Sequence, residues 1–131
     1  IKRHCFDQAL ELVDQVLQVD DGEASYHATR ALVLMNRHLS KDAPFAEMLR
    51  SIDRALELDP NYEDALYYRG QVLRRMGRAD EAIKEFRRVL AINPGNVAAQ
   101  REVRVHRIRR NSSQAKRKSS LMSLVFGKKS K

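Results

Sequence analysis

Four histidines and one cysteine are the residues whose types could support metal or nucleophilic chemistry, and they are scattered along the chain: His4, Cys5, His27, His38 and His106. Metal ligands recur at short spacings, a nucleophilic cysteine needs a histidine placed to take its proton, and phosphate-binding loops are rich in glycine. The sequence has no metal-ligand spacing and no glycine-rich loop, and Cys5 has no evident histidine partner. It therefore predicts no catalytic residue, no metal site and no cofactor, and it indicates a protein that is not an enzyme.

Cys5 is the only cysteine, which excludes an intrachain disulfide and fits a reducing compartment. No helix start or fixed cation is evident beside it, so we expect it to pack rather than to react. The longest apolar runs, such as residues 31–35 and 124–126, fall far short of the ~20 residues that span a bilayer. We expect a cytoplasmic protein without a transmembrane helix.

Positive charge is concentrated at the C-terminal end. Residues 1–96 carry 14 Lys and Arg against 16 Asp and Glu, a balance of −2. Residues 97–131 carry 11 Lys and Arg against the single Glu102, a balance of +10. The overall net charge of +8 is thus a property of one segment rather than of the whole chain.

Apolar residues recur with the three-and-four spacing of a helix face in six segments, and no segment alternates with the period of a strand. Glycine and proline mark the ends of several segments, because proline cannot continue a helix and glycine suits a left-handed cap. The sequence therefore predicts an all-α fold of about six helices. The expected helices cover residues 6–19, 23–39, 45–58, 62–76, 79–92 and 97–110.

The segment at 45–58 matches the segment at 79–92 when Pro60 is placed on Pro94. The helices that precede these two match each other when Tyr26 is placed on Tyr67. Together the two alignments leave seven extra residues in the turn before the helix at 45–58. They also put Thr29 at the position of Gly70.

The segment from Glu63 to Asn96 resembles a tetratricopeptide repeat, whose 34-residue pattern is W-x2-L-G-x2-Y, A-x3-F and P. The matching positions are Leu66, Arg69, Gly70, Leu73, Ala82, Phe86 and Pro94. Two small residues, Gly70 and Ala82, would let the paired helices cross closely, and Phe86 would fill the space beside them. Arg69 departs from the pattern, and in the preceding unit Thr29 and Met48 replace the small residues.

The resemblance implies antiparallel helix pairs stacked in a right-handed superhelix over residues 1–110. On this basis residues 4–21 are the second helix of a partial repeat, 22–60 and 61–96 are repeats, and 97–110 form a capping helix. The lone first helix indicates the C-terminal part of a longer repeat protein and leaves a surface on which two copies could associate. Residues 111–131 are expected to be a basic, disordered tail.

The resemblance also implies a scaffold or adaptor that binds a peptide or helix of another protein in a concave groove. By position, the groove residues are Tyr26, Arg30, Tyr67, Gln71, Arg74 and Arg101. Their arginines favour a partner with an acidic segment, while the alternative is a merely solvated face. Family members that bind chaperone carboxylates use a Lys and Asn clamp, and only an Arg stands at the matching positions here.

The tail offers a second, alternative attachment site. Basic residues flank a short apolar island, the set being Lys116, Arg117, Lys118, Leu121, Leu124, Phe126, Lys128 and Lys129. Such a segment suits an anionic membrane, a polyanion or the groove of a partner, and the alternative is a solvated tail. Attraction to nucleic acid through these charges would be non-specific and dependent on salt.

Overall fold

The computed structural model describes residues 2–126. Within this range the chain forms six helices and no strand, which confirms the predicted all-α fold. The helices are α1 (Lys2–Val19), α2 (Ala24–Arg37), α3 (Phe45–Leu58), α4 (Glu63–Arg75), α5 (Ala79–Ile92) and α6 (Val97–Phe126).

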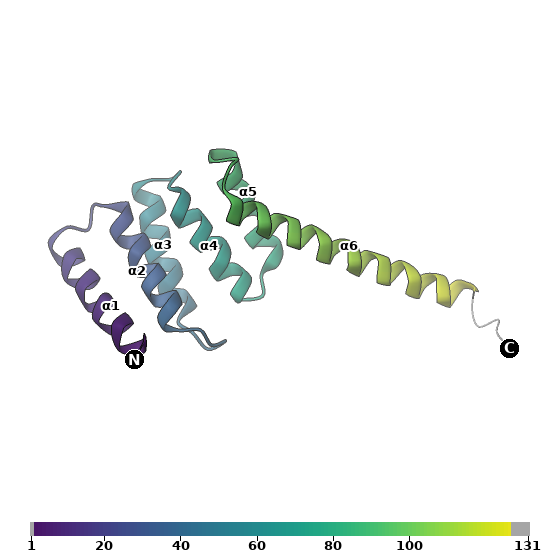
Figure 1. The fold of residues 1–131 in the computed structure, drawn as a ribbon, viewed down its shortest axis with the longest axis horizontal. Coiled ribbons are helices and arrows are strands. Elements are labelled where there is room, and N and C mark those ends of the chain that lie inside the picture. The colour runs from purple at the N-terminus through teal and green to yellow at the C-terminus, as the bar shows by residue number, and fades with distance from the viewer. Residues whose placement is uncertain (1, 127–131) are drawn as a thin grey trace.

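The first five helices lie side by side and the sixth projects away from them (Figure 1). Helices α2 and α3 form one antiparallel pair, and α4 and α5 form the next. Helix α1 packs on α2, and the first part of α6 packs on α5. Each pair is thus covered by its neighbours, which is how a stack of repeats buries its apolar faces.

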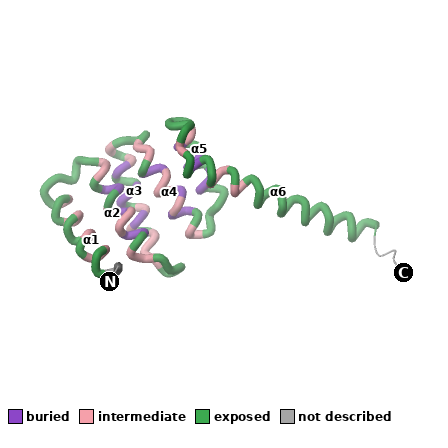
Figure 2. Tube along the Cα trace, in the orientation of Figure 1, coloured by how far each residue is buried: buried purple, intermediate pink, exposed green. Residues whose placement is uncertain are grey.

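The core runs through the array without interruption. One cluster lies between α2 and α3 and includes Met48 and Ile52, and a second lies between α4, α5 and α6 around Phe86. Leu56 packs against both clusters and joins them. Buried residues are concentrated in α2 to α5, whereas the projecting part of α6 is exposed throughout (Figure 2).

Helices α4 and α5 approach each other at Gly70. A Cβ atom at Gly70 would lie 2.6 Å from Cε1 of Phe86, so the ring of Phe86 occupies the space that a larger residue would need. The turn between the helices uses Gly77 at φ 84°, and the Arg78 N–H donates to the carbonyl of Leu73 at 2.9 Å. This is the glycine-dependent helix end that the sequence predicts at Gly77.

The two turns that separate the repeats have the same construction. The side chain of Asp59 accepts a hydrogen bond from the Asn61 N–H at 3.2 Å, and that of Asn93 accepts one from the Gly95 N–H at 3.1 Å. A proline follows each of these residues. The alignment of Pro60 with Pro94 therefore reflects a repeated local structure as well as a repeated sequence.

The predicted register of α2 against α4 is wrong by two residues. The two helices begin at Ala24 and Glu63, and aligning them from these first residues places Ala31 on Gly70. Ala31 is 0% exposed, whereas Thr29, which the predicted alignment assigns to the same position, is exposed. Because α3 begins at Phe45 and α5 at Ala79, the segment from the start of α2 to the start of α3 is longer than its counterpart from α4 to α5 by five residues rather than seven.

The predicted boundary between a capping helix at 97–110 and a disordered tail at 111–131 is also wrong for residues 111–126, and residues 127–131 lie outside the described residues. Helix α6 continues for 30 residues to Phe126. An extension of an existing helix avoids the cost of forming a new nucleus, and lysine, arginine and leucine are good helix formers. The serines and lysines that resemble a disordered composition therefore continue the helix.

Replacing Gly70 with alanine should lower the free energy of unfolding by about 1–2 kcal/mol, because overpacking against Phe86 outweighs the ~1 kcal/mol by which alanine favours a helix. Urea denaturation would measure the change. Gly95→Ala is the matched control, since its nearest contact would be an ordinary 3.5 Å to Asn93. If Gly70→Ala costs as much in a Phe86→Leu background as in the native protein, the proposed clash is not the cause.

The corrected register can be tested with two leucine substitutions on the same helix. Ala31→Leu should cost about 1–3 kcal/mol, because the side chain would be forced into a filled core. Thr29→Leu, at an exposed position, should change stability by no more than about 0.5 kcal/mol. If urea denaturation shows that Thr29→Leu costs more stability than Ala31→Leu, the alignment of Thr29 with Gly70 is correct after all.

Candidate functional site

Four of the predicted groove residues lie on the two neighbouring helices α4 and α6. The hydroxyl of Tyr67 lies 3.4 Å from Nε2 of Gln71, and the ring of Tyr67 packs 5.4 Å from that of Phe86. Burial raises the pKa of Tyr67, the carboxylate of Glu102 raises it further, and Arg74 and Arg101 oppose the shift. This surface therefore carries one neutral aromatic hydroxyl between charged groups of both signs.

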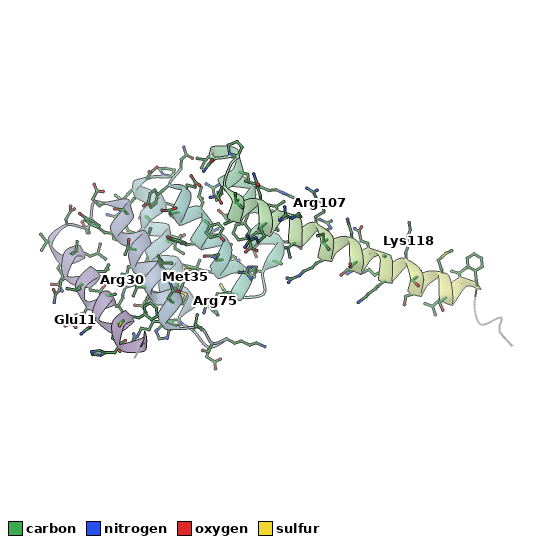
Figure 3. The ribbon with its side chains drawn as sticks, viewed as in Figure 1. Glu11, Arg30, Met35, Arg75, Arg107 and Lys118 are labelled. Carbon is green, nitrogen blue, oxygen red and sulfur yellow. The ribbon has the colours of Figure 1, made fainter. Side chains whose placement is uncertain are left out.

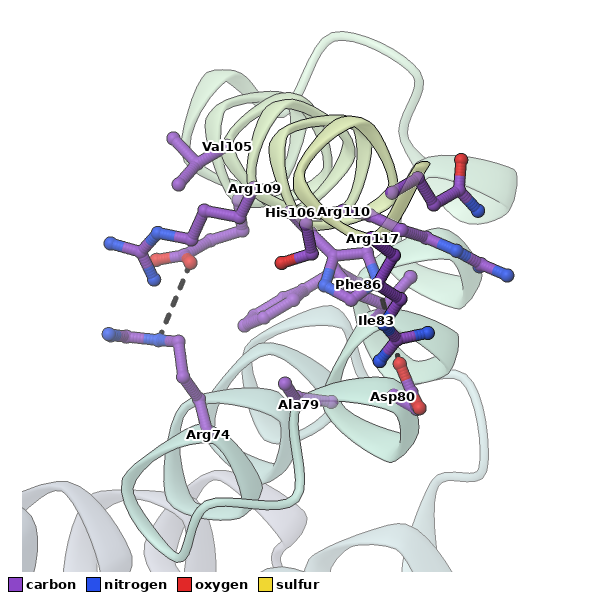
Figure 4. A pocket seen from close by; sticks show the side chains of 14 residues that line it. Arg74, Ala79, Asp80, Ile83, Phe86, Val105, His106, Arg109, Arg110 and Arg117 are labelled. Atoms are coloured by element: carbon purple, nitrogen blue, oxygen red, sulfur yellow. Dashed lines mark ion pairs between the residues drawn. The ribbon is translucent and has the colours of Figure 1, made fainter. Parts of the chain in front are cut away.

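A cleft of about 450 Å³ opens between the α4–α5 pair and α6 (Figure 4). Its floor is formed by apolar side chains of α5, among them Ile83 and Phe86, and its rim by charged side chains of α4, α6 and the start of α5. The cleft exists because α6 leaves the array as it passes the start of α5 (Figure 1). Apolar depth with polar groups at the rim is typical of a site that holds a ligand.

Arginine dominates the rim of the cleft. Arg74 of α4 and three arginines of α6, Arg109, Arg110 and Arg117, line it. The opposing acids are Glu102, whose Oε1 lies 3.4 Å from Nε of Arg74, and Asp80, whose Oδ1 lies 3.7 Å from Nε2 of His106. Four arginines against two carboxylates give the cleft an excess of positive charge.

Arg30 does not lie with the other predicted groove residues. It faces α1 and α3 (Figure 3), where its guanidinium group binds Asp14 at 2.6 Å, Glu47 at 2.7 Å and Ser51 at 3.0 Å. Burial acts to lower the pKa of Arg30, but the hydrogen bonds to Asp14 and Glu47 raise it. The side chain of Arg30 is only 19% exposed, which indicates a residue that joins three helices.

Arg69 repeats this arrangement one unit later. It pairs with Asp53 at 3.4 Å and with Glu85 at 2.8 Å, and so links α4 to α3 and α5. The corrected register, which aligns Ala24 with Glu63, also sets Arg30 on Arg69. The same register aligns Tyr26 with Ala65, which packs in the core cluster of α2 and α3. Tyr26 is therefore not the counterpart of Tyr67 and does not belong to the same line of groove residues.

Glu102, Arg109 and Arg110 are cleft residues that the sequence analysis missed, and it named Arg117 only as part of the tail. The signal for Glu102 was present, because it is the only acidic residue after position 96. No spacing rule reveals Arg117 as a cleft residue, because its place depends on how far α6 continues as a helix. Of the predicted tail residues, Lys128 and Lys129 lie outside the described residues.

The residues that opened the sequence analysis do not form a cluster in the structure. Among residues 2–126, no group of three or more His, Cys, Asp or Glu is placed to bind a metal ion. Cys5 is exposed on α1, so the prediction that it packs in the interior is wrong. No helix in the described range combines the length and apolar character required to cross a membrane.

Arg30→Gln should destabilise the array by about 1–2 kcal/mol, because it removes charged hydrogen bonds that are partly screened by solvent. Arg54→Gln is the control: Arg54 pairs with Glu57 at 3.3 Å on an exposed surface, and its loss should cost no more than about 0.5 kcal/mol. Thermal and urea denaturation would compare the two. Equal costs would mean that Arg30 does not join the helices as described.

The stacked antiparallel pairs and their equivalent turns define a helical repeat protein. The family model for the tetratricopeptide repeat matches residues 63–96. Residues 63–96 are therefore a tetratricopeptide repeat, and the fold of the chain is that of a tetratricopeptide-repeat domain. This confirms the family that the sequence indicated.

This chain spans less than a quarter of the length of each of the curated relatives that follow. The human FK506-binding protein-like is 43% identical over 54 residues, which cover 41% of this chain and 16% of the relative. The tetratricopeptide repeat and J domain-containing co-chaperone DNJ1 of Cryptococcus neoformans is 32% identical over 78 residues, covering 60% of this chain and 15% of that protein. Mouse peptidyl-prolyl cis-trans isomerase FKBP4 is 34% identical over 103 residues, covering 76% of this chain and 22% of that protein.

Solved structures match the array more completely. The first tetratricopeptide-repeat domain of human RPAP3 superposes with a TM-score of 0.72 at 25% identity, covering 87% of this chain and 86% of that domain. The second domain of human RPAP3, solved in complex with an HSP70 peptide, gives a TM-score of 0.66 at 26% identity, with coverage of 78% and 81%.

Proposed function

We propose that this chain is a protein-interaction module, of the scaffold or adaptor kind, that binds an acidic peptide segment of another protein between α4 and α6. The ligand would lie against Tyr67 and Gln71, and its carboxylates would pair with Arg74 and Arg101. The cleft beyond Arg74 would take the next ligand residues. We further propose that this binding takes place in the cytoplasm.

The main support for the proposal is the excess of arginine around the apolar floor of the cleft. A guanidinium group binds a carboxylate through two parallel hydrogen bonds, and such bonds are stronger where solvent is partly excluded. Arg74 pairs with Glu102 at 3.4 Å, so the chain itself supplies this arginine with a carboxylate. An incoming carboxylate would therefore compete with Glu102 for Arg74.

Two structural relatives support this choice of ligand. The second domain of human RPAP3 was solved with the HSP70 peptide SGPTIEEVD, and the first repeat domain of Spaghetti with the HSP90 peptide SRMEEVD. Both peptides end in Glu-Glu-Val-Asp, which carries three acidic side chains. The Lys and Asn clamp used by chaperone-binding family members is largely absent here, so the proposal specifies an acidic peptide without naming its source.

Binding of labelled SGPTIEEVD, measured by fluorescence anisotropy, tests the proposal. A peptide with its acids replaced by Gln and Asn should bind at least about tenfold more weakly, since each lost charged pair is worth about 1.5–3 kcal/mol. Arg74→Gln combined with Arg109→Gln should weaken binding of the acidic peptide to the same degree.

Arg87→Gln combined with Arg104→Gln is the matched control, because both residues are exposed and neither lines the cleft. It removes the same amount of positive charge and should leave the affinity within about twofold, as expected for screened surface charges. Equal binding of the acidic and neutral peptides would contradict the proposal. So would equal losses for the control pair and for the pair Arg74 and Arg109.

Glu102→Gln should strengthen binding of the acidic peptide about three- to tenfold, because it removes the carboxylate that competes for Arg74 and repels the ligand. The neutral peptide should be unaffected. Salt titration gives a further check: the gain should shrink as ionic strength rises. Weaker binding by the Glu102→Gln variant would show that Glu102 supports the ligand instead of competing with it.

A further inference from the structure

The last part of α6 forms an unpartnered amphipathic helix. From residue 111 to residue 126 every side chain is exposed, and the helix extends away from the array into solvent (Figures 1 and 3). Five large apolar side chains are 55–79% exposed near its end: Leu121, Met122, Leu124, Val125 and Phe126. At ~1.5 Å per residue, this segment carries them about 20 Å beyond the last packed turn.

Four of these five side chains share one face. Leu121 and Val125 are four residues apart, as are Met122 and Phe126, so the four form two adjacent columns along the helix. At about 100° per residue they span an arc of about 140°. Leu124 falls outside this arc, and so do all the serines of the segment: Ser112, Ser113, Ser119, Ser120 and Ser123.

Positive charge accompanies the apolar face. Lys116, Arg117 and Lys118 lie one turn before it, and Lys118 falls within its arc. A lysine in that place can lay its stem along apolar surface while its ammonium group stays in a polar layer. The sequence contains no acidic residue after Glu102, and Lys128, Lys129 and Lys131 follow the helix.

We propose that this extension of α6, residues 111–126, binds the surface of an anionic lipid bilayer. The apolar columns would enter the boundary between headgroups and acyl chains, and the basic residues would contact lipid phosphate and carboxylate groups. The serine face would remain toward water. Charge complementarity favours a lipid surface over the acidic groove of one particular protein, because basic residues lie before and within the apolar face and follow it in the sequence.

This inference does not depend on the peptide-binding proposal. The apolar side chains of the extension do not line the cleft, although Ser113, Gln114 and Arg117 of the extension do, and Arg117 also belongs to the basic cluster. A variant that loses peptide binding through Arg74 and Arg109 should keep its lipid binding, and the failure of either proposal leaves the other intact.

Co-sedimentation of the full chain with vesicles tests the proposal. Vesicles of phosphatidylcholine with roughly 30% phosphatidylserine should pellet the protein, and vesicles of phosphatidylcholine alone should pellet at least about fivefold less, because each basic residue gains from an anionic surface. The bound fraction should fall as salt is raised. Absence of binding to the anionic vesicles would overturn the proposal.

Two sets of substitutions distinguish binding through the apolar face from non-specific hydrophobic binding. Leu121→Ser with Val125→Ser should reduce the bound fraction at least about tenfold, because the face loses much of its apolar area. Leu124→Ser, at a position of similar exposure outside the face, should reduce it less than about twofold. Circular dichroism would check that both variants keep their helix content. Equal effects of the two sets would overturn the proposed orientation.

A parallel binding measurement with duplex DNA distinguishes polyanion binding from lipid binding. If the full chain binds DNA and anionic vesicles alike, and Leu121→Ser with Val125→Ser changes neither, the extension is a non-specific basic segment and the proposal is wrong.

The chain contains no tryptophan, so Met122→Trp provides a single fluorescent reporter. Its emission should shift to the blue on anionic vesicles, and by more than that of a Leu124→Trp variant.

Discussion

The close approach of α4 and α5 at Gly70 determines how α4, α5 and α6 pack against one another. Because Gly70 has no side chain, the ring of Phe86 can sit against the backbone of α4, where it is 0% exposed. The same ring contacts Tyr67 and lies in the cluster that receives Ala99 of α6. One small residue thus fixes both the helix pair and the two helices that carry the candidate site.

Much of the fold could be predicted because the features that set it are local. Prolines, glycines and apolar spacing define where α3, α4 and α5 end, and the repeated Asp59 and Asn93 turns follow from the same chemistry. The register of α2 could not be found this way, since Tyr26 and Tyr67 match in type but not in place. The register of α2 depends on side-chain contacts with other helices: Ala31 must be small because it is buried, and Arg30 must reach Asp14 and Ser51.

The candidate site was predictable only where it follows the repeat period. Tyr67, Gln71 and Arg74 occupy one face of α4, and their spacing shows this directly. The cleft does not follow from any spacing, because it forms where α6 diverges from α5 and because its rim includes Arg117, which the sequence analysis placed in a disordered tail. Composition predicted disorder there, but residues joined to an existing helix need no nucleus of their own.

Because α6 is one continuous helix, its two candidate surfaces are held at a fixed angle. Glu102, His106 and Arg109 turn toward the cleft, and at about 100° per residue they lie about 160° around the axis from the centre of the Leu121 and Met122 columns. Arg117, one turn before Leu121 on the same side of the helix, lies between the two surfaces. A ligand held beside Glu102 and Arg109 would therefore leave the apolar face uncovered, and a surface bound to that face would leave this part of the cleft open. The length of the extension adds to this separation, since the array stands about 20 Å from the apolar columns along the axis. Sequence and geometry thus allow a peptide and a lipid surface to be held at the same time.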